Sequence, residues 1–197
     1  MHLVALFAAT MLLALQAPFA RADEPEASDA IRLDSARSEV GFTVKLVWLV
    51  GIDGRFGQID GVVRSDRFRS QISVDARIRA DAISMSTHLY ENWVKSPEFF
   101  DVEKYPYIEF TSEPLPEARL RKGGDLNGML TLRGIRQPVT FRLLPATCER
   151  PAYGCPIQVV GAIRRSEFGM RSRRGALSDK VELRFNVYAV STDGGAP

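Results

Sequence analysis

Apolar and polar residues alternate with a period of two along most of this chain. Residues 72–80 are the clearest example, because isoleucine, valine and alanine take every second position and polar side chains lie between them. This alternation predicts a β-strand with one face against a core and the other in solvent. The same pattern predicts strands at residues 40–46, 58–63, 108–111, 126–132, 139–143, 157–164 and 181–187.

Two segments depart from the alternation. Residues 48–57 contain several glycines, which are typical of a turn and bulge. Residues 84–102 instead predict one short helix, in which Leu89 and Trp93 lie four positions apart and share a face. Ser84 or Ser86 is the expected N-cap, and the proline at position 97 ends the helix, before a compact aromatic loop.

About eight amphipathic strands predict an all-β fold with a single antiparallel sheet, whose apolar face must be covered. A second sheet would make a sandwich, whereas curling the sheet on itself would make a barrel and remove its edges. Glycines within the strands mark tight bends or close backbone approaches, which favours the barrel. They occur at positions 41, 61, 128 and 161. An eight-stranded barrel is either filled by its own side chains or holds one apolar ligand.

The amino terminus predicts export. A short apolar run is followed by Ala20-Arg21-Ala22, a small-x-small cleavage site, so we interpret residues 1–22 as a signal peptide. The run is shorter than the roughly 20 residues that a membrane-spanning helix needs. Residues 23–30 form a loose lead-in, residues 31–190 the barrel domain and residues 191–197 a tail. We therefore expect a periplasmic protein with no stable membrane insertion after cleavage.

The chain has two cysteines, Cys148 and Cys155, in a turn-rich loop between two predicted strands. In an oxidising compartment such a pair is expected to form a disulfide. The spacing does not fit a zinc site, since no further cysteine or histidine lies nearby.

Charge and motifs narrow the function classes. The chain has 26 Lys and Arg against 24 Asp and Glu, so no global field favours nucleic acid or an anionic membrane. After signal removal His88 is the only histidine, which excludes multi-histidine metal sites and most base-assisted nucleophiles. His88 and Glu91 lie three apart on the predicted helix and are interpreted as an ordinary surface pair. No nucleophile elbow, P-loop or dinucleotide fingerprint is present.

Four segments then resemble, in order, a known family. They are SEVGFTV at 38–44, KSPEFFDVEKYPYIEFTS at 95–112, LNGMLTLRGIRQPV at 126–139 and RSEFGM at 165–170. Together they resemble the YceI-like, polyisoprenoid-binding family of exported, lipocalin-like antiparallel barrels. The resemblance implies an apolar cavity for an isoprenoid lipid of the quinone or polyprenyl type, with no other cofactor and no catalytic residues.

We expect aromatic and aliphatic side chains to line this cavity. The candidates are Phe42, Val44, Leu89, Trp93, Phe99, Phe100, Phe110, Phe141, Phe168 and Phe185. The segment 84–102 is expected to cover one mouth of the barrel. The chain departs from the family at Lys45, where a histidine is usual, and around Trp93, which implies a change in head-group preference near Lys45, Asn92 or the 164–165 arginines.

Two other readings remain open at this point. A filled barrel would act as an envelope interaction or stress-related protein, and a pair of carboxylates with shifted pKa would support a hydrolase. A homodimer is also compatible with the sequence.

Overall fold

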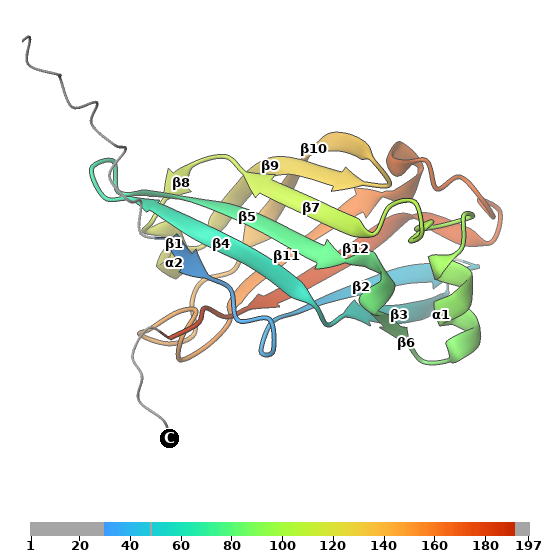
Figure 1. The fold of residues 1–197 in the computed structure, drawn as a ribbon, viewed down its shortest axis with the longest axis horizontal. Coiled ribbons are helices and arrows are strands. Elements are labelled where there is room, and N and C mark those ends of the chain that lie inside the picture. Colours follow the sequence, from blue (N-terminus) through green and yellow to red (C-terminus); the bar gives the residue numbers. More distant parts are fainter. Residues whose placement is uncertain (1–29, 48, 192–197) are drawn as a thin grey trace, which may run out of the picture.

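One antiparallel sheet forms the framework of the described part of the chain. The computed structural model describes residues 30–47 and 49–191, so the predicted signal peptide, most of the lead-in and most of the tail lie outside the described residues. Within them, twelve strands form a single curled sheet, with two short α-helices at its ends (Figure 1). The strands are β1 (Ala30–Arg32), β2 (Glu39–Leu46), β3 (Val50–Phe56), β4 (Ile59–Asp66), β5 (Gln71–Arg79), β6 (Ile83–Met85), β7 (Tyr107–Ser112), β8 (Leu115–Pro116), β9 (Gly124–Leu132), β10 (Ile135–Leu143), β11 (Ile157–Arg164) and β12 (Leu177–Val187).

The two edges of the sheet are joined by the covalent connection between β3 and β4. Its strand order is β1-β4-β5-β7-β9-β10-β11-β12-β2-β3-β6, and all neighbours are antiparallel. Only Gly57 and Gln58 separate β3 from β4, although these strands lie near opposite ends of that order. Strands β3 and β4 are therefore consecutive halves of one bent strand path. Strand β4 pairs antiparallel with β5, and β3 pairs antiparallel with β6. The predicted antiparallel barrel class is confirmed, with eight long strand paths and the short β1 and β8 added.

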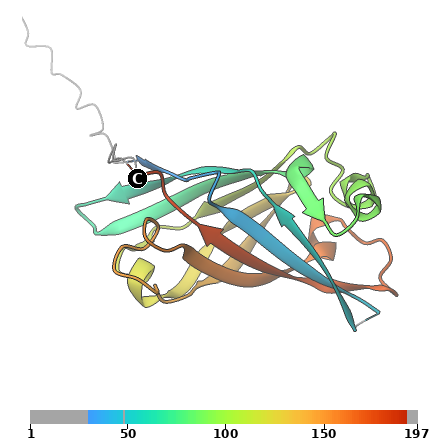
Figure 2. The same ribbon diagram turned by 90° about the horizontal axis from the view of Figure 1, so that it is seen from below.

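The two ends of the barrel differ. At one end lie helix α1 (His88–Lys95) and the loop that follows it; at the other lie helix α2 (Arg119–Lys122), the β4–β5 hairpin and the 144–156 loop (Figure 2). The N-cap of α1 is Thr87, whose hydroxyl accepts a hydrogen bond from Tyr90 N at 3.3 Å, and not the predicted Ser84 or Ser86. No helix among the described residues is long and apolar enough to cross a membrane.

The segment 48–57 was wrongly predicted as a turn. Residues 50–56 form β3, which pairs with β2 along seven positions. Gly54 is needed because a Cβ there would lie 2.3 Å from the Phe42 ring, so this glycine permits a close ring approach inside a strand. Strand β10 likewise begins earlier than predicted, since it starts at Ile135 and contains Pro138, whereas the sequence predicted a strand from residue 139.

Candidate functional site

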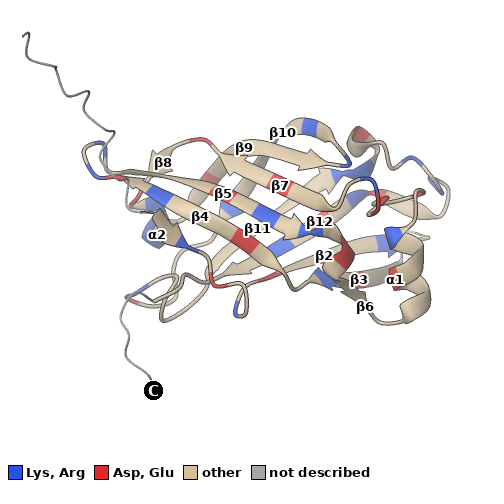
Figure 3. Ribbon diagram, in the orientation of Figure 1, with Lys and Arg blue, Asp and Glu red and all other residues tan. Residues whose placement is uncertain are grey.

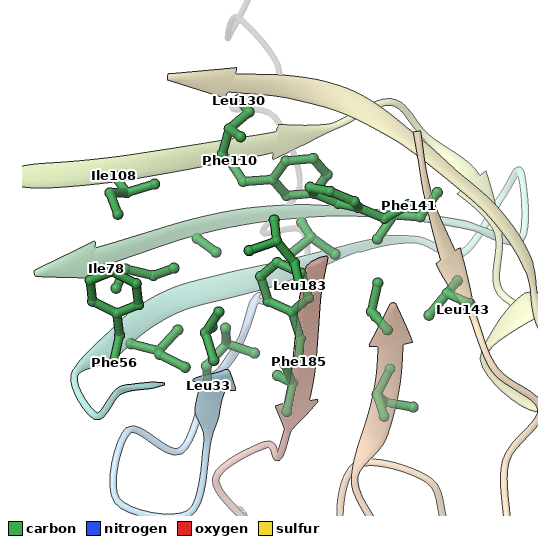
Figure 4. Close-up of a pocket in the computed structure, with 18 of the residues that line it drawn as sticks. Leu33, Phe56, Ile78, Ile108, Phe110, Leu130, Phe141, Leu143, Leu183 and Phe185 are labelled. Carbon is green, nitrogen blue, oxygen red and sulfur yellow. The ribbon is translucent and has the colours of Figure 1, made fainter. Parts of the chain in front are cut away.

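The barrel encloses one large cavity with a volume of about 740 Å³. Its wall is built from the inward-facing residues of the long strands, which are mostly leucine, isoleucine, valine and phenylalanine (Figure 4). The lining runs from Trp93 and Phe100 at the α1 end to Leu120 and Tyr153 at the α2 end. The cavity therefore extends along the barrel, and a volume of about 300–1,000 Å³ is typical of small-molecule sites.

Eight of the predicted site residues lie on the cavity wall. They are Phe42, Val44, Trp93, Phe99, Phe100, Phe110, Phe141 and Phe185. Strand residues among them follow the period-two pattern, so the sequence alternation placed them correctly on the inner face.

Three predicted residues lie elsewhere. Lys45 alternates with Val44 and is exposed on the outer face of β2. Leu89 is 75% exposed, because α1 contacts the barrel through Tyr90, Trp93 and Val94, so the face that Leu89 was predicted to share with Trp93 is only partly buried. Phe168 is fully buried, at 0% exposure, in the short 3₁₀ helix at residues 165–168, which packs between β10 and β12. These residues do not line the cavity.

A row of aromatic rings crosses the wall of the cavity. The centroids of Phe110 and Phe141 lie 5.5 Å apart, and those of Phe141 and Phe185 lie 5.3 Å apart. Two of the rings lie over glycines: a Cβ at Gly161 would be 2.4 Å from the Phe141 ring, and one at Gly128 would be 2.7 Å from the Phe110 ring. The absence of side chains at these glycines lets the rings lie close to the neighbouring strands, which leaves the lumen open.

Aromatic packing closes the α1 end. Trp93 meets Phe99 edge-on with centroids 4.7 Å apart, and Phe100 meets Phe56 edge-on at 5.6 Å. Arg133, in the β9–β10 turn, donates hydrogen bonds to the carbonyl oxygens of Pro97 and Phe99. None of the cavity-lining residues at this end is exposed. The helix and aromatic loop cover this end of the barrel, as the sequence predicted.

A buried cation supports the same end. The Arg165 side chain is 2% exposed and donates hydrogen bonds to four backbone carbonyls, those of Met170, Ser172, Leu177 and Ser178, at 2.7–3.1 Å. Burial lowers the pKa of Arg165, and nearby Asp179 acts in the opposite direction. This arginine was predicted only as part of a head-group region. In the structure its hydrogen bonds stabilise the loop before β12.

Glu98 ties the aromatic loop to the loop before β12. Its carboxylate accepts hydrogen bonds from Trp93 Nε1 at 2.9 Å and from Arg173 Nε at 3.1 Å. The Arg173 guanidinium also lies 5.2 Å from the Trp93 ring centroid. The hydrogen bond from Trp93, followed by that from Arg173, lowers the pKa of Glu98. Sequence reasoning missed this residue, since its two partners are brought together only by the fold.

We expect Glu98→Gln to remove a pH-dependent part of the stability. Because the folded-state pKa of Glu98 is lowered, its contribution is present at neutral pH and disappears as the pH falls through the ordinary carboxyl range and below. The melting temperatures of wild type and variant should therefore differ at pH 7 and converge in acid. A difference that is the same at both pH values would contradict the ionic contribution.

The cavity reaches solvent at the opposite, α2 end. Every exposed residue of its lining lies there: Ser70, Glu117, Ala118, Arg121, Glu149 and Arg150. The mouth is therefore formed by the β4–β5 turn, α2 and the 144–156 loop. Of the predicted head-group region, Lys45, Asn92 and Arg164 are exposed at positions outside the cavity lining. Only the alternation at Lys45 signalled this in the sequence. Arg165 does line the cavity, but it is buried at the closed end and does not lie at the mouth.

The sequence of this chain is similar to those of known proteins. The sequence profile of the YceI-like domain matches residues 32–189. The chain belongs to the YceI-like family. Protein YceI of Salmonella arizonae is 27% identical over 158 residues, covering 77% of this chain and 80% of the relative. A UPF0312 protein of Staphylococcus aureus (strain USA300) is 26% identical over 155 residues, covering 76% of this chain and 87% of the relative.

Solved structures share the fold of this YceI-like chain. BcnA of Burkholderia cenocepacia superimposes with a TM-score of 0.66 at 23% identity, over 81% of this chain and 99% of BcnA. A polyisoprenoid binding domain from Saccharophagus degradans superimposes with a TM-score of 0.62 at 12% identity, over 83% of this chain and 99% of that domain. At these identities the likeness is one of fold.

The YceI-like barrel has a disulfide at its mouth. Cys148 and Cys155 are bonded, with their Cα atoms 6.0 Å apart, and the loop between them supplies lining residues from Glu149 to Tyr153. Arg37 fixes the loop from outside by donating a hydrogen bond to Tyr153 O at 3.2 Å. The disulfide therefore restrains one side of the opening.

Replacing both cysteines by serine is expected to lower the free energy of unfolding by roughly 2–3 kcal/mol, because the disulfide limits the freedom of the unfolded loop. Chemical denaturation of the double variant, with the reduced and oxidised wild type alongside, measures this difference. An unchanged denaturation midpoint would show that the loop is held by its backbone hydrogen bonds alone.

Proposed function

We propose that this protein is a periplasmic binding protein that sequesters or carries an isoprenoid lipid, of the quinone or polyprenyl type, without turnover. The observation that carries the proposal is the 740 Å³ apolar cavity, open at one end and closed at the other. Burial of an apolar chain in such a lumen is favourable by about 25 cal/mol per Å². The tail would lie along the barrel axis, with the head group at the mouth.

The type of chain is inferred from two sources. The wall combines phenylalanine rings with branched aliphatic side chains, which suit a methyl-branched, unsaturated hydrocarbon. The structurally similar domain from Saccharophagus degradans is described as polyisoprenoid binding. The predicted signal peptide and the Cys148–Cys155 disulfide support the periplasm as the compartment.

The alternative readings are less well supported. A filled barrel does not agree with the cavity volume. For a hydrolase, the carboxylates that line the cavity are Glu117 and Glu149, which are exposed at the mouth and accept no hydrogen bond from a described residue. The apolar lining favours binding over carboxylate catalysis.

Native mass spectrometry of protein purified from periplasm tests the proposal. We expect a discrete adduct, and organic extraction should release a molecule with an isoprenoid tail. Protein delipidated under denaturing conditions and refolded should regain the adduct when a quinone or polyprenyl lipid is supplied in detergent. A chain that carries no lipid and takes up none would overturn the proposal.

A further inference from the structure

The β4–β5 turn carries an uncovered aromatic ring. Phe68 is 92% exposed and lies between Arg67 and Arg69. Arg69 forms an ion pair with Asp66 at 3.1 Å, and Phe68 lies between these two residues in the turn. An exposed phenylalanine beside basic side chains is typical of a surface that meets the interface of a membrane.

This tip is part of the cavity mouth. Glu117 N donates a hydrogen bond to Ser70 O at 3.0 Å, and Ala146 N donates one to Arg121 O at 3.0 Å. These bonds join three segments, residues 66–70, 117–122 and 146–153, which we call the mouth rim. Figure 2 shows the hairpin and α2 together at the end of the barrel away from α1. Phe68 itself does not line the cavity.

The mouth rim has an excess of positive charge. Its three segments contain six Lys and Arg residues and three Asp and Glu residues. Basic residues are coloured blue on α2 and on the hairpin in Figure 3. Arg121, Lys122 and Arg150 make no side-chain hydrogen bond or ion pair to any described residue, so their charges face solvent. Each such cation near an anionic bilayer contributes about 1 kcal/mol of attraction.

We propose that the mouth rim docks on the surface of an anionic phospholipid bilayer, with Phe68 inserted at the head-group boundary. The inference rests on the proposed function, because an isoprenoid is dissolved in membranes and a carrier must present its opening to them. Docking in this orientation places the mouth against the bilayer. The apolar tail then passes between bilayer and lumen with little exposure to water.

The closed end provides a matched control. The β2–β3 turn also exposes apolar side chains, with Leu49 at 88%, and Val47 N donates to Ala176 O, which places the turn beside the loop before β12. No exposed residue lines the cavity at that end. If the protein docks through its mouth, a substitution at Leu49 should leave its binding to membranes unchanged.

Vesicle flotation tests the docking. Wild-type protein should bind vesicles of phosphatidylcholine with phosphatidylglycerol, and bind pure phosphatidylcholine vesicles more weakly, with the difference reduced by salt. Phe68→Ser is expected to weaken binding about tenfold, through loss of apolar burial. Lys122→Glu is expected to weaken it by at least roughly tenfold, through reversal of one charge. Leu49→Ser should bind like wild type.

Lipid uptake from detergent, followed by native mass spectrometry, separates the two proposals. Phe68→Ser should take up an isoprenoid as wild type does, because the residue lies outside the cavity. Equal vesicle binding by wild type, Phe68→Ser and Lys122→Glu, or a loss confined to Leu49→Ser, would overturn the docking inference. Absence of vesicle binding by wild type would also overturn it, and would direct attention to a protein partner. Failure of detergent uptake by wild type would overturn the lipid-binding function instead.

Discussion

Replacing Arg165 by methionine is expected to lower the free energy of unfolding by about 3–5 kcal/mol, because several carbonyl oxygens lose their donor at once and each buried group left without a partner commonly costs about 1–3 kcal/mol. The guanidinium serves four carbonyl oxygens, and methionine offers none of them a donor. The affected carbonyls lie in the loop before β12 and at the start of that strand. The same loop carries Arg173, so the Glu98 contact should weaken as well.

Urea denaturation followed by circular dichroism measures the loss, provided that the transition is two-state. Arg164→Met is the matched control, because Arg164 is the preceding residue and is exposed; its effect should stay within about 0.5 kcal/mol. Arg165→Lys should fall between the two, since one ammonium group cannot reach all four carbonyls. A loss below about 1 kcal/mol for Arg165→Met would show that water replaces the guanidinium at the carbonyls.

The strands were predictable because each buries one face. Strand β5 was predicted at residues 72–80 and is observed at Gln71–Arg79. The prediction of a turn at residues 48–57 was wrong because glycine has two structural roles that cannot be distinguished in a sequence. It permits a turn, and it also permits the close approach of the Phe42 ring to Gly54. Which use applies depends on a neighbour in another strand.

The cavity wall was predictable for the same reason as the strands, but the mouth was not. Alternation places Phe42 and Val44 inside and, read consistently, Lys45 outside. The head-group assignment by resemblance overrode that signal. The mouth rim, in contrast, joins segments that are separated by tens of residues, and nothing local in Glu117 or Arg150 indicates that they border one cavity. Their proximity is a consequence of sheet curvature and strand order.

Leu183→Trp is expected to reduce the affinity for a long isoprenoid at least tenfold, equivalent to about 1.4 kcal/mol. Leu183 on β12 faces the lumen (Figure 4). Its partners on the adjacent strands are Phe42 on β2 and Gly161 on β11. A larger ring at this position occupies space that the tail needs between the mouth and the closed end. The substitution adds apolar volume, so the barrel should remain folded, and near-wild-type circular dichroism would verify this.

Chain length makes the test specific. A short isoprenoid alcohol that occupies only the part of the lumen near the mouth should bind Leu183→Trp nearly as well as wild type, whereas a long polyprenyl chain should not. Arg184→Trp is the matched control, because Arg184 is the next residue along β12 and is exposed on the outer face. Displacement of a fluorescent lipid by each isoprenoid gives the affinities. Equal loss for short and long chains would contradict obstruction of the lumen by the new ring. It would indicate that the substitution distorts the cavity wall as a whole.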